Sequence, residues 1–584
     1  MMFECFQLRG DEHRVNEIGT EALSLEKRDV LRILPAETSS EVSINFIQQW
    51  LSACFSTHAE CPGPLTQYPE GLLQGIRFLQ IDNHSVVLTE DMRPLRYAAL
   101  SHCWGSGMNI LKTTTQTLKD HKTGGIALET LPKTFQDAVT ICQRLEISFL
   151  WIDSLCIIQD SSEDWRNQAS RMAEVYENAV ITIAASKAQD PSQGCFTRTH
   201  WSYRGVLLPG YADTFIRRVC VPPGAAFHSY HNHDEWPLYK RGWIYQELVL
   251  SPRVIHFNEE LMWYCTTHAK RGQSMTNKFH GMFSQSQKHK RFTAKDFRRQ
   301  WYQTIEAYSW RDMTFPTDKL PAIAAIAERQ QQLRPNDQYL AGLWKSTLLF
   351  DLLWYIKDKH ATIDLRSQIT DGNVPSWSWA STKLGVTWTQ FSFQNKLRCV
   401  EVIEAIYTTD GPIFSGNITM AEIVLRVPKI KLEDLRAYDD LELDLSSPTG
   451  DEDELSHPDS RLMELTLGDL RFDTVVFTSP TVETQQHSFA IPLSDHEYHG
   501  DEFNLRETGS LMLLVTQTHE RGHYRRLGVA YVAYAGTFYL VAKQRTNGME
   551  IGKDDPRDLV AQAEYRRLLV EKIENLETHI ITLI

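Results

Sequence analysis

The pattern of hydrophobic and polar positions is clearest between residues 149 and 186, where it predicts a strand, a helix and a second strand. Residues 149–152 form an apolar run that is long enough for a buried strand and too short for a helix. The run ends at Asp153. Ser161, followed three positions later by Asp164, then predicts a capped helix start. Apolar residues recur along this helix at helical spacing: Trp165, Ala169, Met172, Tyr176 and Ala179. With the β-rich run 180–185, the segment forms a βαβ unit, which indicates a parallel sheet.

The neighbouring segments extend this unit into a larger core. Residues 97–100 predict a first strand, and residues 130–132 open a helix with a proline near its first turn. After an insertion over residues 187–234, residues 235–250 predict a helix and residues 253–257 a strand. We therefore predict the α/β class, with a flavodoxin-like parallel sheet, flanking helices and a ligand site at the carboxyl ends of the strands. The residues at those ends are Ser101, His102, Asp153, Ser154 and Ser186.

The regions outside this core have other patterns. Residues 1–45 show mixed charge and no clear periodicity, residues 46–62 begin as a helix, and residues 77–81 and 85–89 predict a hairpin. The chain after residue 263 predicts a larger α+β region. Its expected features are a helical stretch at 300–357, strands within 375–426 and 464–543, an exposed acidic loop at 439–460 and a last helix at 556–583.

These patterns predict four regions along the chain. They are an N-terminal segment with a helix and a hairpin (1–95), a central domain (97–247, with a core that extends to about 262), a mainly helical region (263–380) and a β-rich region with the acidic loop and the C-terminal helix (381–584).

Composition narrows the classes of function. The chain has 584 residues and a formal net charge of −14, which argues against a general affinity for nucleic acid or anionic membranes. No apolar run approaches the length of a membrane span, and the first residues lack the apolar core of a secretory signal. Ten scattered cysteines indicate reduced thiols. We expect a cytoplasmic protein, with the nucleus as the alternative compartment, and no nucleic acid or membrane partner.

Two groups of cysteine and histidine raise the question of a metal site. Cys54, His58 and Cys61 resemble half of a zinc site, but no partner pair lies nearby in the sequence, which favours small buried thiols and a packed imidazole. The second group lies in a Pro- and Gly-rich insertion without a fixed scaffold. Its members are Cys220, His228, His231 and His233. We therefore predict no metal ligands.

Six segments together resemble the fungal heterokaryon-incompatibility (HET) domain family. They are YAALSHCWG (97–105), LPKTFQDAV (131–139), LWIDSLCIIQD (150–160), RMAEVYENA (171–179), GCF (194–196) and RGWIYQE (241–247). YSWRDMTFPTDKLPAIAAIA, YLAGLW and PSWSWAS, further on, resemble the C-terminal companions of this family. The resemblance implies self/non-self recognition and regulated cell death when incompatible hyphae fuse. It also implies self-association or binding to another incompatibility protein.

The same family is distantly similar to Toll/interleukin receptor (TIR) domains, and the predicted element order fits that fold. Two insertions, at 106–129 and 187–234, interrupt the compact TIR pattern. Many TIR domains cleave NAD with a glutamate on the helix that here carries Trp243 and Glu247. The resemblance therefore implies NAD as a substrate and no bound cofactor. The alternatives are a non-enzymatic interaction or scaffold module and an inactive family member.

Glu247 is the candidate catalytic residue for cleavage of the nicotinamide–ribose bond. The nicotinamide leaves as a neutral group while positive charge develops on the ribose, so one nearby carboxylate stabilises the transition state and no metal is required. Trp243 is among the apolar neighbours that would desolvate this carboxylate. The competing interpretation is that Glu247 pairs with Arg241 or Arg253 and only holds its helix in place.

The remaining candidates are expected to bind the substrate. Asp153 either binds a ribose hydroxyl or caps the loop that runs to Ser161. Trp104 and Gly105 either offer a stacking face and a close backbone approach, or Trp104 is part of the core. Ser101 and His102 suggest a nucleophile and a base, but adjacent residues on a strand point to opposite faces, so a shared proton is not expected. The expected substrate-binding set is Ser101, Trp104, Gly105, Asp153 and Trp243.

Overall fold

The structure is a computed structural model that divides into two compact units. It describes residues 3–7, 34–58, 61, 72–90, 96–105, 110–211, 214–218, 220, 233–265, 269–270, 294–356, 374–388, 395–396, 399–431, 436–437, 466–472, 488–499, 506–518, 520–533 and 577–584. Unit 1 comprises Met1–Arg291 and Arg311–Met313, and unit 2 comprises Phe292–Trp310 and Thr314–Ile584. Each unit is treated by itself below.

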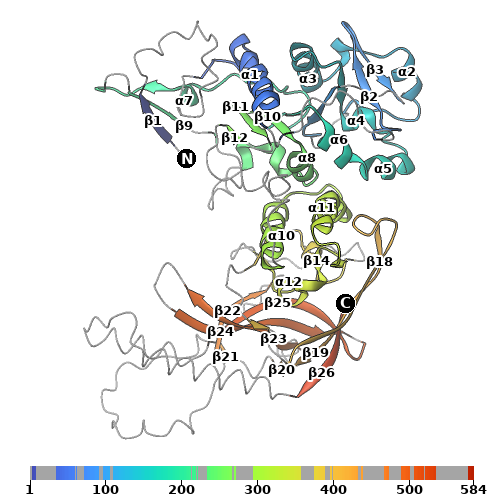
Figure 1. Cartoon of the computed structure of the whole chain (residues 1–584), viewed down its shortest axis with the longest axis vertical. Helices are drawn as coiled ribbons and strands as arrows, with labels where there is room; N and C mark the ends of the chain where they lie inside the picture. Colours follow the sequence, from blue (N-terminus) through green and yellow to red (C-terminus); the bar gives the residue numbers. More distant parts are fainter. Residues whose placement is uncertain are drawn as a thin grey trace. The chain divides into compact units, whose positions relative to one another are not determined.

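A mixed sheet forms the centre of unit 1 (Figure 1). Within the described ranges its order is β12-β11-β10-β7-β4-β6-β2-β3-β5. The four middle strands are parallel: β6 (Phe149–Trp151), β4 (Tyr97–Ser101), β7 (Ile181–Ala184) and β10 (Arg253–Phe257). Numbered along the chain, they lie in the order 2-1-3-4, which is the start of the flavodoxin-like order. The predicted parallel core is confirmed.

Antiparallel strands complete both edges, so the sheet is mixed. One edge consists of β11 (Leu261–Cys265) and β12 (Ala269–Lys270). At the other edge, β2 (Phe78–Ile81) pairs with β6, β3 (Ser85–Thr89) pairs with β2, and β5 (Ile126–Ala127) pairs with β3. The predicted hairpin is therefore confirmed as β2–β3, and it continues the sheet beyond its parallel part.

Helices cover both faces of this sheet. Figure 1 shows α1 (Glu41–Thr57) and α3 (Lys133–Arg144) on one face, and α6 (Met172–Asn178) and α8 (Ile244–Leu250) on the other. Every residue of β4, β7 and β10 is buried, as expected for strands covered on both sides. The other elements of unit 1 are β1 (Phe3–Gln7), α2 (Leu118–Thr123), η3 (Leu128–Thr130), α4 (Asp153–Cys156), α5 (Ser162–Ala169), α7 (Trp201–Arg204), β8 (Val206–Leu207), β9 (Thr214–Arg218), η4 (His233–Glu235) and η5 (Pro237–Lys240).

Two predicted helices are shorter than expected. The Ser161 side chain accepts from the Asp164 amide, which confirms the capped start, but the helix divides into α5 and α6. The break lies beside Arg171, whose guanidinium donates to the Gln74 carbonyl and to Glu174. The single helix predicted over residues 235–250 is wrong. Its first half forms η4 and η5, and only α8 is an α-helix.

A buried carboxylate explains two of the motifs. Asp137 in α3 is 2% exposed and accepts hydrogen bonds from the backbone amides of Cys195 (2.9 Å) and Phe196 (3.2 Å). Gly194 precedes them with φ +87°, and a β-carbon there would lie 2.5 Å from the Asp137 carboxylate. The segments LPKTFQDAV and GCF therefore form one contact, in which glycine leaves room for the acceptor.

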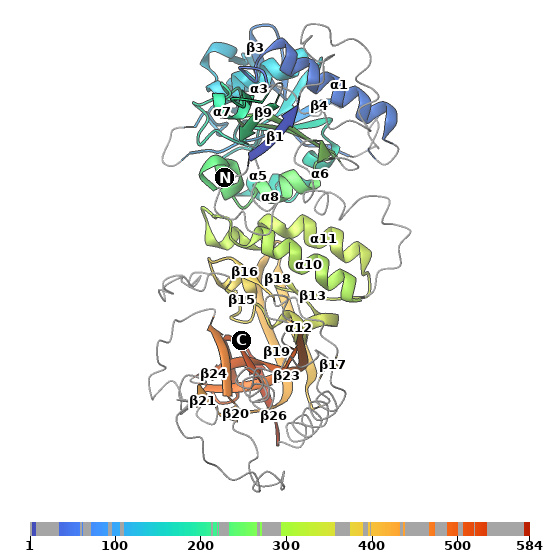
Figure 2. The same ribbon diagram turned by 90° about the vertical axis from the view of Figure 1, so that its left-hand side faces the viewer.

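Unit 2 combines short helices with a large sheet. Figure 2 shows α10 (Ala294–Tyr308) and α11 (Ala324–Leu333) side by side. The described strands form a 10-stranded sheet with the path β17-β23-β24-β25-β26-β19-β18. Its members are β17 (Asn395–Lys396), β18 (Glu401–Asp410), β19 (Asn417–Pro428), β20 (Ile430–Lys431), β21 (Arg436–Ala437), β22 (Thr466–Phe472), β23 (Ser488–His499), β24 (Arg506–Gln517), β25 (His523–Ala533) and β26 (Thr578–Leu583). The smaller elements are η8 (Pro316–Lys319), η9 (Pro321–Ile323), β13 (Tyr339–Leu340), β14 (Leu343–Trp344), η10 (Lys345–Thr347), α12 (Leu348–Asp351), β15 (Tyr355–Ile356), η12 (Trp379–Ser381) and β16 (Val386–Thr387).

The C-terminal companion motifs meet in the core of unit 2. Trp301 and Trp379 both donate from their indole nitrogens to the Gly342 carbonyl, at 2.7 and 2.9 Å. Gly342 has φ +94°, and a β-carbon there would lie 2.5 Å from the Trp379 indole. Ser378 donates to the neighbouring Ala341 carbonyl at 2.6 Å. YLAGLW and PSWSWAS are therefore two halves of one tryptophan-lined contact.

Several predictions for the C-terminal region have a mixed outcome. The last helix predicted over 556–583 is wrong at its end, because β26 occupies Thr578–Leu583 and pairs with β19. The rest of that helix and the acidic loop at 439–460 lie outside the described residues. In the described part of the chain, no helix combines the length and apolar character needed to cross a membrane.

We expect Asp137→Ala to weaken the contact between α3 and residues 194–196. The substitution leaves two buried amides without their acceptor, which costs about 2 kcal/mol and makes local exchange about 30-fold faster. Hydrogen-exchange mass spectrometry on peptides that contain Cys195 and Phe196 measures this. Glu129→Ala removes an exposed carboxylate and serves as the control. Unchanged exchange in Asp137→Ala would contradict the role assigned to this residue.

Candidate functional site

The order of the sheet reverses at β4, which makes the carboxyl ends of β4 and β7 the topological switch point of the sheet. From β4 the chain crosses to β6 on one side, while β7 lies on the other side. Open α/β sheets bind ligands at such a switch point because the loops diverge there. Ser101 is the last residue of β4, and the segment 102–105 leaves the sheet directly above this point.

Glu247 reaches the switch point from α8. Its side chain is 2% exposed, and the Ser101 hydroxyl, which is fully buried, donates to Glu247 Oε2 at 2.7 Å. The end of α8 is also tied to the sheet, because Ser251 Oγ donates to the Glu247 carbonyl at 2.6 Å and lies 2.6 Å from Thr182 Oγ1 of β7. The carboxylate is therefore held against β4 by helix and strand together.

Burial raises the pKa of Glu247 from its ordinary value of 4.5 to about 7. Desolvation is the largest cause, since it penalises the charged form. The positive charge of Arg241 lowers this pKa, the negative charge of Asp153 raises it, and hydrogen bonds from Ser101 and Tyr176 lower it. A carboxyl group with such a pKa exchanges its proton near neutral pH, as general acids and bases require.

A second carboxylate, Asp153, lies just after β6, the strand next to β4. Trp104 Nε1 donates to Asp153 Oδ2 at 2.8 Å, and the Ser154 amide donates to Oδ1 at 2.7 Å. His102 Nδ1 lies 3.8 Å from Asp153 Oδ1, and burial lowers the pKa of His102 to about 4, so its ring is neutral at neutral pH. Asp153 thus both caps the loop after β6 and fixes the Trp104 ring.

Arg241 connects the two carboxylates through its charge. Its guanidinium donates to the His102 carbonyl and lies 5.9 Å from the centre of the Trp104 ring. Among the described residues, no ion pair joins Glu247 to Arg241. Arg253, the other residue considered as an ion-pair partner of Glu247, donates instead to Cys54 Sγ and the Val180 carbonyl. The carboxylate of Glu247 is therefore buried beside a cation without being neutralised by direct contact.

The next segment fixes the entry to α8. The Gly242 amide donates to the Asp312 carbonyl at 2.9 Å, and Arg311 donates to the Tyr239 carbonyl at 2.5 Å. This docking onto residues 311–313 replaces the helical hydrogen bonds that the sequence pattern predicts before α8. It sets the point at which the helix begins, and so the position of Glu247.

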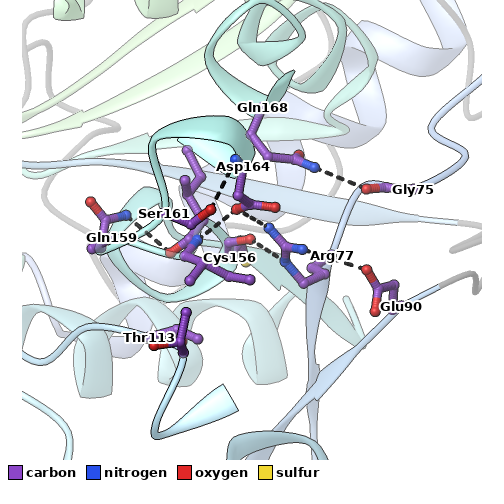
Figure 3. Close-up of polar contacts among 12 residues, drawn as sticks. Gly75, Arg77, Glu90, Thr113, Cys156, Gln159, Ser161, Asp164 and Gln168 are labelled. Carbon is purple, nitrogen blue, oxygen red and sulfur yellow. Dashed lines mark hydrogen bonds and ion pairs between the residues drawn. The ribbon is translucent and has the colours of Figure 1, made fainter. Parts of the chain in front are cut away.

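A polar network supports the loop that begins at Asp153 (Figure 3). Arg77, which is 4% exposed, donates to the Cys156 carbonyl at 2.7 Å and to Asp164 Oδ2 at 2.5 Å. The same Asp164 oxygen accepts from the Ile158 amide at 2.8 Å. Gln159 donates to the Asp153 carbonyl at 3.0 Å. The loop is thus bound at both ends, which limits the freedom of the Asp153 carboxylate.

The structure brings the predicted residues together in two groups. Glu247 contacts Ser101, and Asp153 contacts Trp104. Gly105 follows with φ +77° and is exposed. Trp243 is half-buried at the start of α8 and packs edge-on against Trp165, with ring centroids 6.1 Å apart.

Sequence reasoning missed the contribution of Tyr176. Tyr176 is 1% exposed, donates to the Leu100 carbonyl at 3.2 Å and also interacts with Glu247. The helical spacing predicts Tyr176 only as part of the apolar stripe. Its place within the family segment RMAEVYENA is the feature of the sequence that could have indicated a role in the site. His102 packs edge-on against Phe135 of α3, while Ser101 faces α8, so these neighbours occupy opposite faces.

The two cysteine–histidine groups have different outcomes. His228 and His231 lie outside the described residues, so the group in the insertion stays untested. Cys54, His58 and Cys61 lie together with Cys265, which the sequence pattern did not connect to them.

Comparison with known families identifies one region of the chain. Residues 97–247 match the family described as "Heterokaryon incompatibility protein (HET)". The match begins at the first residue of β4 and ends at Glu247. It therefore contains both hydrogen-bonded pairs of the candidate site, Glu247 with Ser101 and Asp153 with Trp104. No curated protein and no solved structure matches the chain significantly.

The raised pKa of Glu247 predicts a measurable dependence of stability on pH. Between the ordinary value of 4.5 and about 7, the folded protein binds a proton that the unfolded chain has lost. The free energy of unfolding therefore falls as the pH rises from about 4.5 to about 7, and it levels off once the group ionises in the folded state as well. Glu247→Gln has no such proton, so we expect it to gain about 2 to 3 kcal/mol relative to the wild type between about pH 5 and about pH 8. Urea unfolding of both proteins at these pH values measures the gain.

The lowered pKa of His102 makes the free energy of unfolding rise with pH, because the unfolded chain binds more protons than the folded protein between about pH 4 and about pH 6.5. Both proteins share this contribution, so it cancels in their difference. Glu163→Gln, at an exposed position of α5, is the control. A difference between wild type and Glu247→Gln that is the same at both pH values would contradict the raised pKa.

Proposed function

Because the chain carries a HET domain at residues 97–247, we propose that it acts in heterokaryon incompatibility, in self/non-self recognition that leads to regulated cell death. Within that role, the proposed activity is hydrolysis of NAD at the nicotinamide–ribose bond, with Glu247 as the catalytic residue. NAD is the substrate, and the domain needs no bound cofactor for this reaction.

The observation that carries this proposal is the buried carboxylate of Glu247 at the switch point. A buried carboxylate without a directly contacting cation costs stability. Such an arrangement, with its pKa raised towards neutrality, is typical of functional sites. Its location supports a site as well, since ligands of α/β sheets bind at the carboxyl ends of the strands.

The proposed reaction needs one well-placed negative charge. The bond between nicotinamide nitrogen and ribose carbon breaks, and its electron pair moves to the nicotinamide, which leaves as a neutral molecule. The ionised Glu247 stabilises the positive charge that develops on the ribose, as carboxylates do in glycoside cleavage. Water then adds to the ribose carbon and releases a proton, which gives ADP-ribose. Asp153 and Trp104 are proposed to bind a ribose hydroxyl and to stack on a ring of the substrate.

Access to Glu247 is the step at which the proposed activity is controlled. Both Glu247 and Ser101 are buried, so substrate reaches them only after the segment 102–105 moves. The Trp104–Asp153 and Arg241–His102 hydrogen bonds hold that segment in place. We propose that association with another copy of the chain, or with another incompatibility protein, breaks these bonds and opens the site.

A second candidate function has its own supporting observation. The Ser101–Glu247 hydrogen bond joins α8 to β4, so Glu247 also has a structural role that requires no catalysis. In this alternative the HET domain is an interaction module, and cell death follows from the recruitment of partners. Toxicity on expression separates the two functions, because only the catalytic one depends on the charge of Glu247.

We expect purified full-length protein, joined to an inducible dimerisation module, to release nicotinamide from NAD after dimerisation. Glu247→Gln keeps an acceptor for the Ser101 hydroxyl but lacks the charge, so the rate should fall by about 10²–10³-fold. Chromatography of the released nicotinamide measures the rate. Glu163→Gln is the control, because it also removes one carboxylate from the HET domain but lies exposed on α5. Undiminished release by Glu247→Gln would remove its catalytic assignment, and the absence of release in every assembly state would favour the interaction module.

The pH profile provides a separate test of Glu247 as the titrating group. Since the ionised form stabilises the developing charge, kcat/KM should rise with pH through about 7. Ser101→Ala removes a hydrogen bond that lowers the pKa of Glu247, so the midpoint of the profile should move to higher pH. An unmoved midpoint in Ser101→Ala would assign the titration to another group.

A further inference from the structure

Four metal-ligand side chains meet where α1 approaches β11, the second strand from one end of the described sheet. Cys54 lies in the last turn of α1, His58 caps the end of that helix, and the Cys61 amide donates to the His58 carbonyl at 3.2 Å. Cys265 is the last residue of β11. The ligand atoms of all four lie within 4.8 Å of one another. Two segments far apart in the sequence thus supply one compact set of three thiols and one imidazole.

The distances within this set fit a single tetrahedral ion. Zinc binds sulfur at about 2.3 Å and imidazole nitrogen at about 2.0 Å, which places the two ligand atoms about 3.5 Å apart. His58 Nδ1 lies 3.4 Å from Cys265 Sγ and 3.7 Å from Cys61 Sγ. One imidazole nitrogen therefore faces two sulfurs at the separations that a shared ion imposes.

The surroundings favour thiolates that are compensated by a cation. All three cysteines are buried, with exposures of 0% for Cys54, 6% for Cys61 and 2% for Cys265. Metals bind thiols in the deprotonated form, so a divalent ion would supply the positive charge that three buried thiolates need.

Arg253 supplies the remaining charge. It pairs with Cys265 across β10 and β11, is 1% exposed, and donates from Nε to Cys54 Sγ at 3.2 Å. Three thiolates, a neutral imidazole and a divalent zinc ion carry a net charge of −1, which the guanidinium offsets. A donor bonded to a ligand sulfur is the outer-shell partner that structural metal sites use to orient their ligands.

We propose that this cluster is a structural zinc site, with one ion held by Cys54, His58, Cys61 and Cys265. The ligand set occupies all four tetrahedral positions and leaves none for water or substrate, which distinguishes a structural ion from a catalytic one. The spacing of the first three ligands, Cys-x3-His-x2-Cys, fits a helix end followed by a tight turn. The site ties α1 to the β11 side of the central sheet, separately from the switch point at Glu247.

Other uses of these side chains fit less well. A disulfide would join two of the sulfurs and leave the third cysteine and His58 without a common partner. An iron–sulfur cluster spreads its ligands around several metal atoms, whereas these four converge on one point. Soft sulfur and nitrogen ligands in a tetrahedron select zinc over magnesium or calcium, which prefer oxygen.

The first experiment measures metal in the full-length protein. Tag-free chain is produced in zinc-supplemented medium, dialysed against metal-free buffer and analysed by plasma mass spectrometry. We expect about one zinc ion per chain. Replacement with Co²⁺ should produce the charge-transfer absorption of a tetrahedral thiolate site. A strong chelator should remove the ion and lower the melting temperature, because the ion binds the folded state only.

Ligand variants locate the ion. Cys54→Ser and Cys265→Ser, one from each segment, should each lower the zinc content to about 0.1 ion per chain or less. Cys142→Ser is the matched control, because Cys142 is an equally buried cysteine on α3 outside the cluster, and it should keep the wild-type content. His58→Gln, at a half-buried position, is the milder ligand variant if a serine variant fails to fold.

Three results would overturn the proposal. The first is folded wild-type protein that carries no zinc and takes up none in a titration. The second is an intact mass, after alkylation without reduction, that reveals a disulfide among these cysteines. The third is unchanged zinc content in folded Cys54→Ser, Cys265→Ser and His58→Gln variants, which would place the ion elsewhere.

Discussion

The constraint on which the HET domain depends is the burial of one carboxylate between a helix and a parallel sheet. Glu247 lies in a region of low dielectric, where an ionised group is stable only if nearby dipoles and charges replace its lost water. Ser101 provides a hydroxyl from β4, Tyr176 one from α6, and Arg241 a positive charge. Each of these groups comes from a different element, so the carboxylate can be accommodated only when the strands and both helices are in place.

The same principle explains why the family signature is scattered along the chain. Its segments are hydrogen-bond partners of one another rather than independent sites. Asp137 of one segment accepts from Cys195 and Phe196 of another, and Trp104 donates to Asp153 across two strands. Buried polar groups tolerate few replacements, because an unpaired donor or acceptor costs more than a hydrogen bond contributes.

Local patterns were sufficient to predict the core strands and the capped start of α5. Strands buried on both faces are short apolar runs, and a cap requires only residues within one turn. The prediction of a helix over residues 235–250 was wrong because the Gly242 amide donates to the Asp312 carbonyl, which lies seventy positions further along the chain. A long-range backbone contact of this kind overrides local propensity and leaves no periodic trace.

In the candidate site, too, the sequence predicted single residues but not the long-range contacts between them. Glu247 and Asp153 were identified from a family resemblance and from their place at the ends of elements. Their pairing with Ser101 and Trp104 was not predicted, because Ser101 and Glu247, for example, are separated by 146 positions. Cys265 is the extreme case. A single cysteine at the end of a strand has no local signal for a ligand, and only the antiparallel edge of the sheet brings it to α1.

The position of Cys265 has a consequence for the order in which the chain matures during synthesis. Cys54 and Cys61 leave the ribosome before the HET domain, and Cys265 leaves it after the last strand of the parallel core, so the four side chains of this cluster straddle the whole domain. The cluster is completed only after every element between them has been translated. A chain that ends within residues 97–247 therefore holds only three of the four ligands.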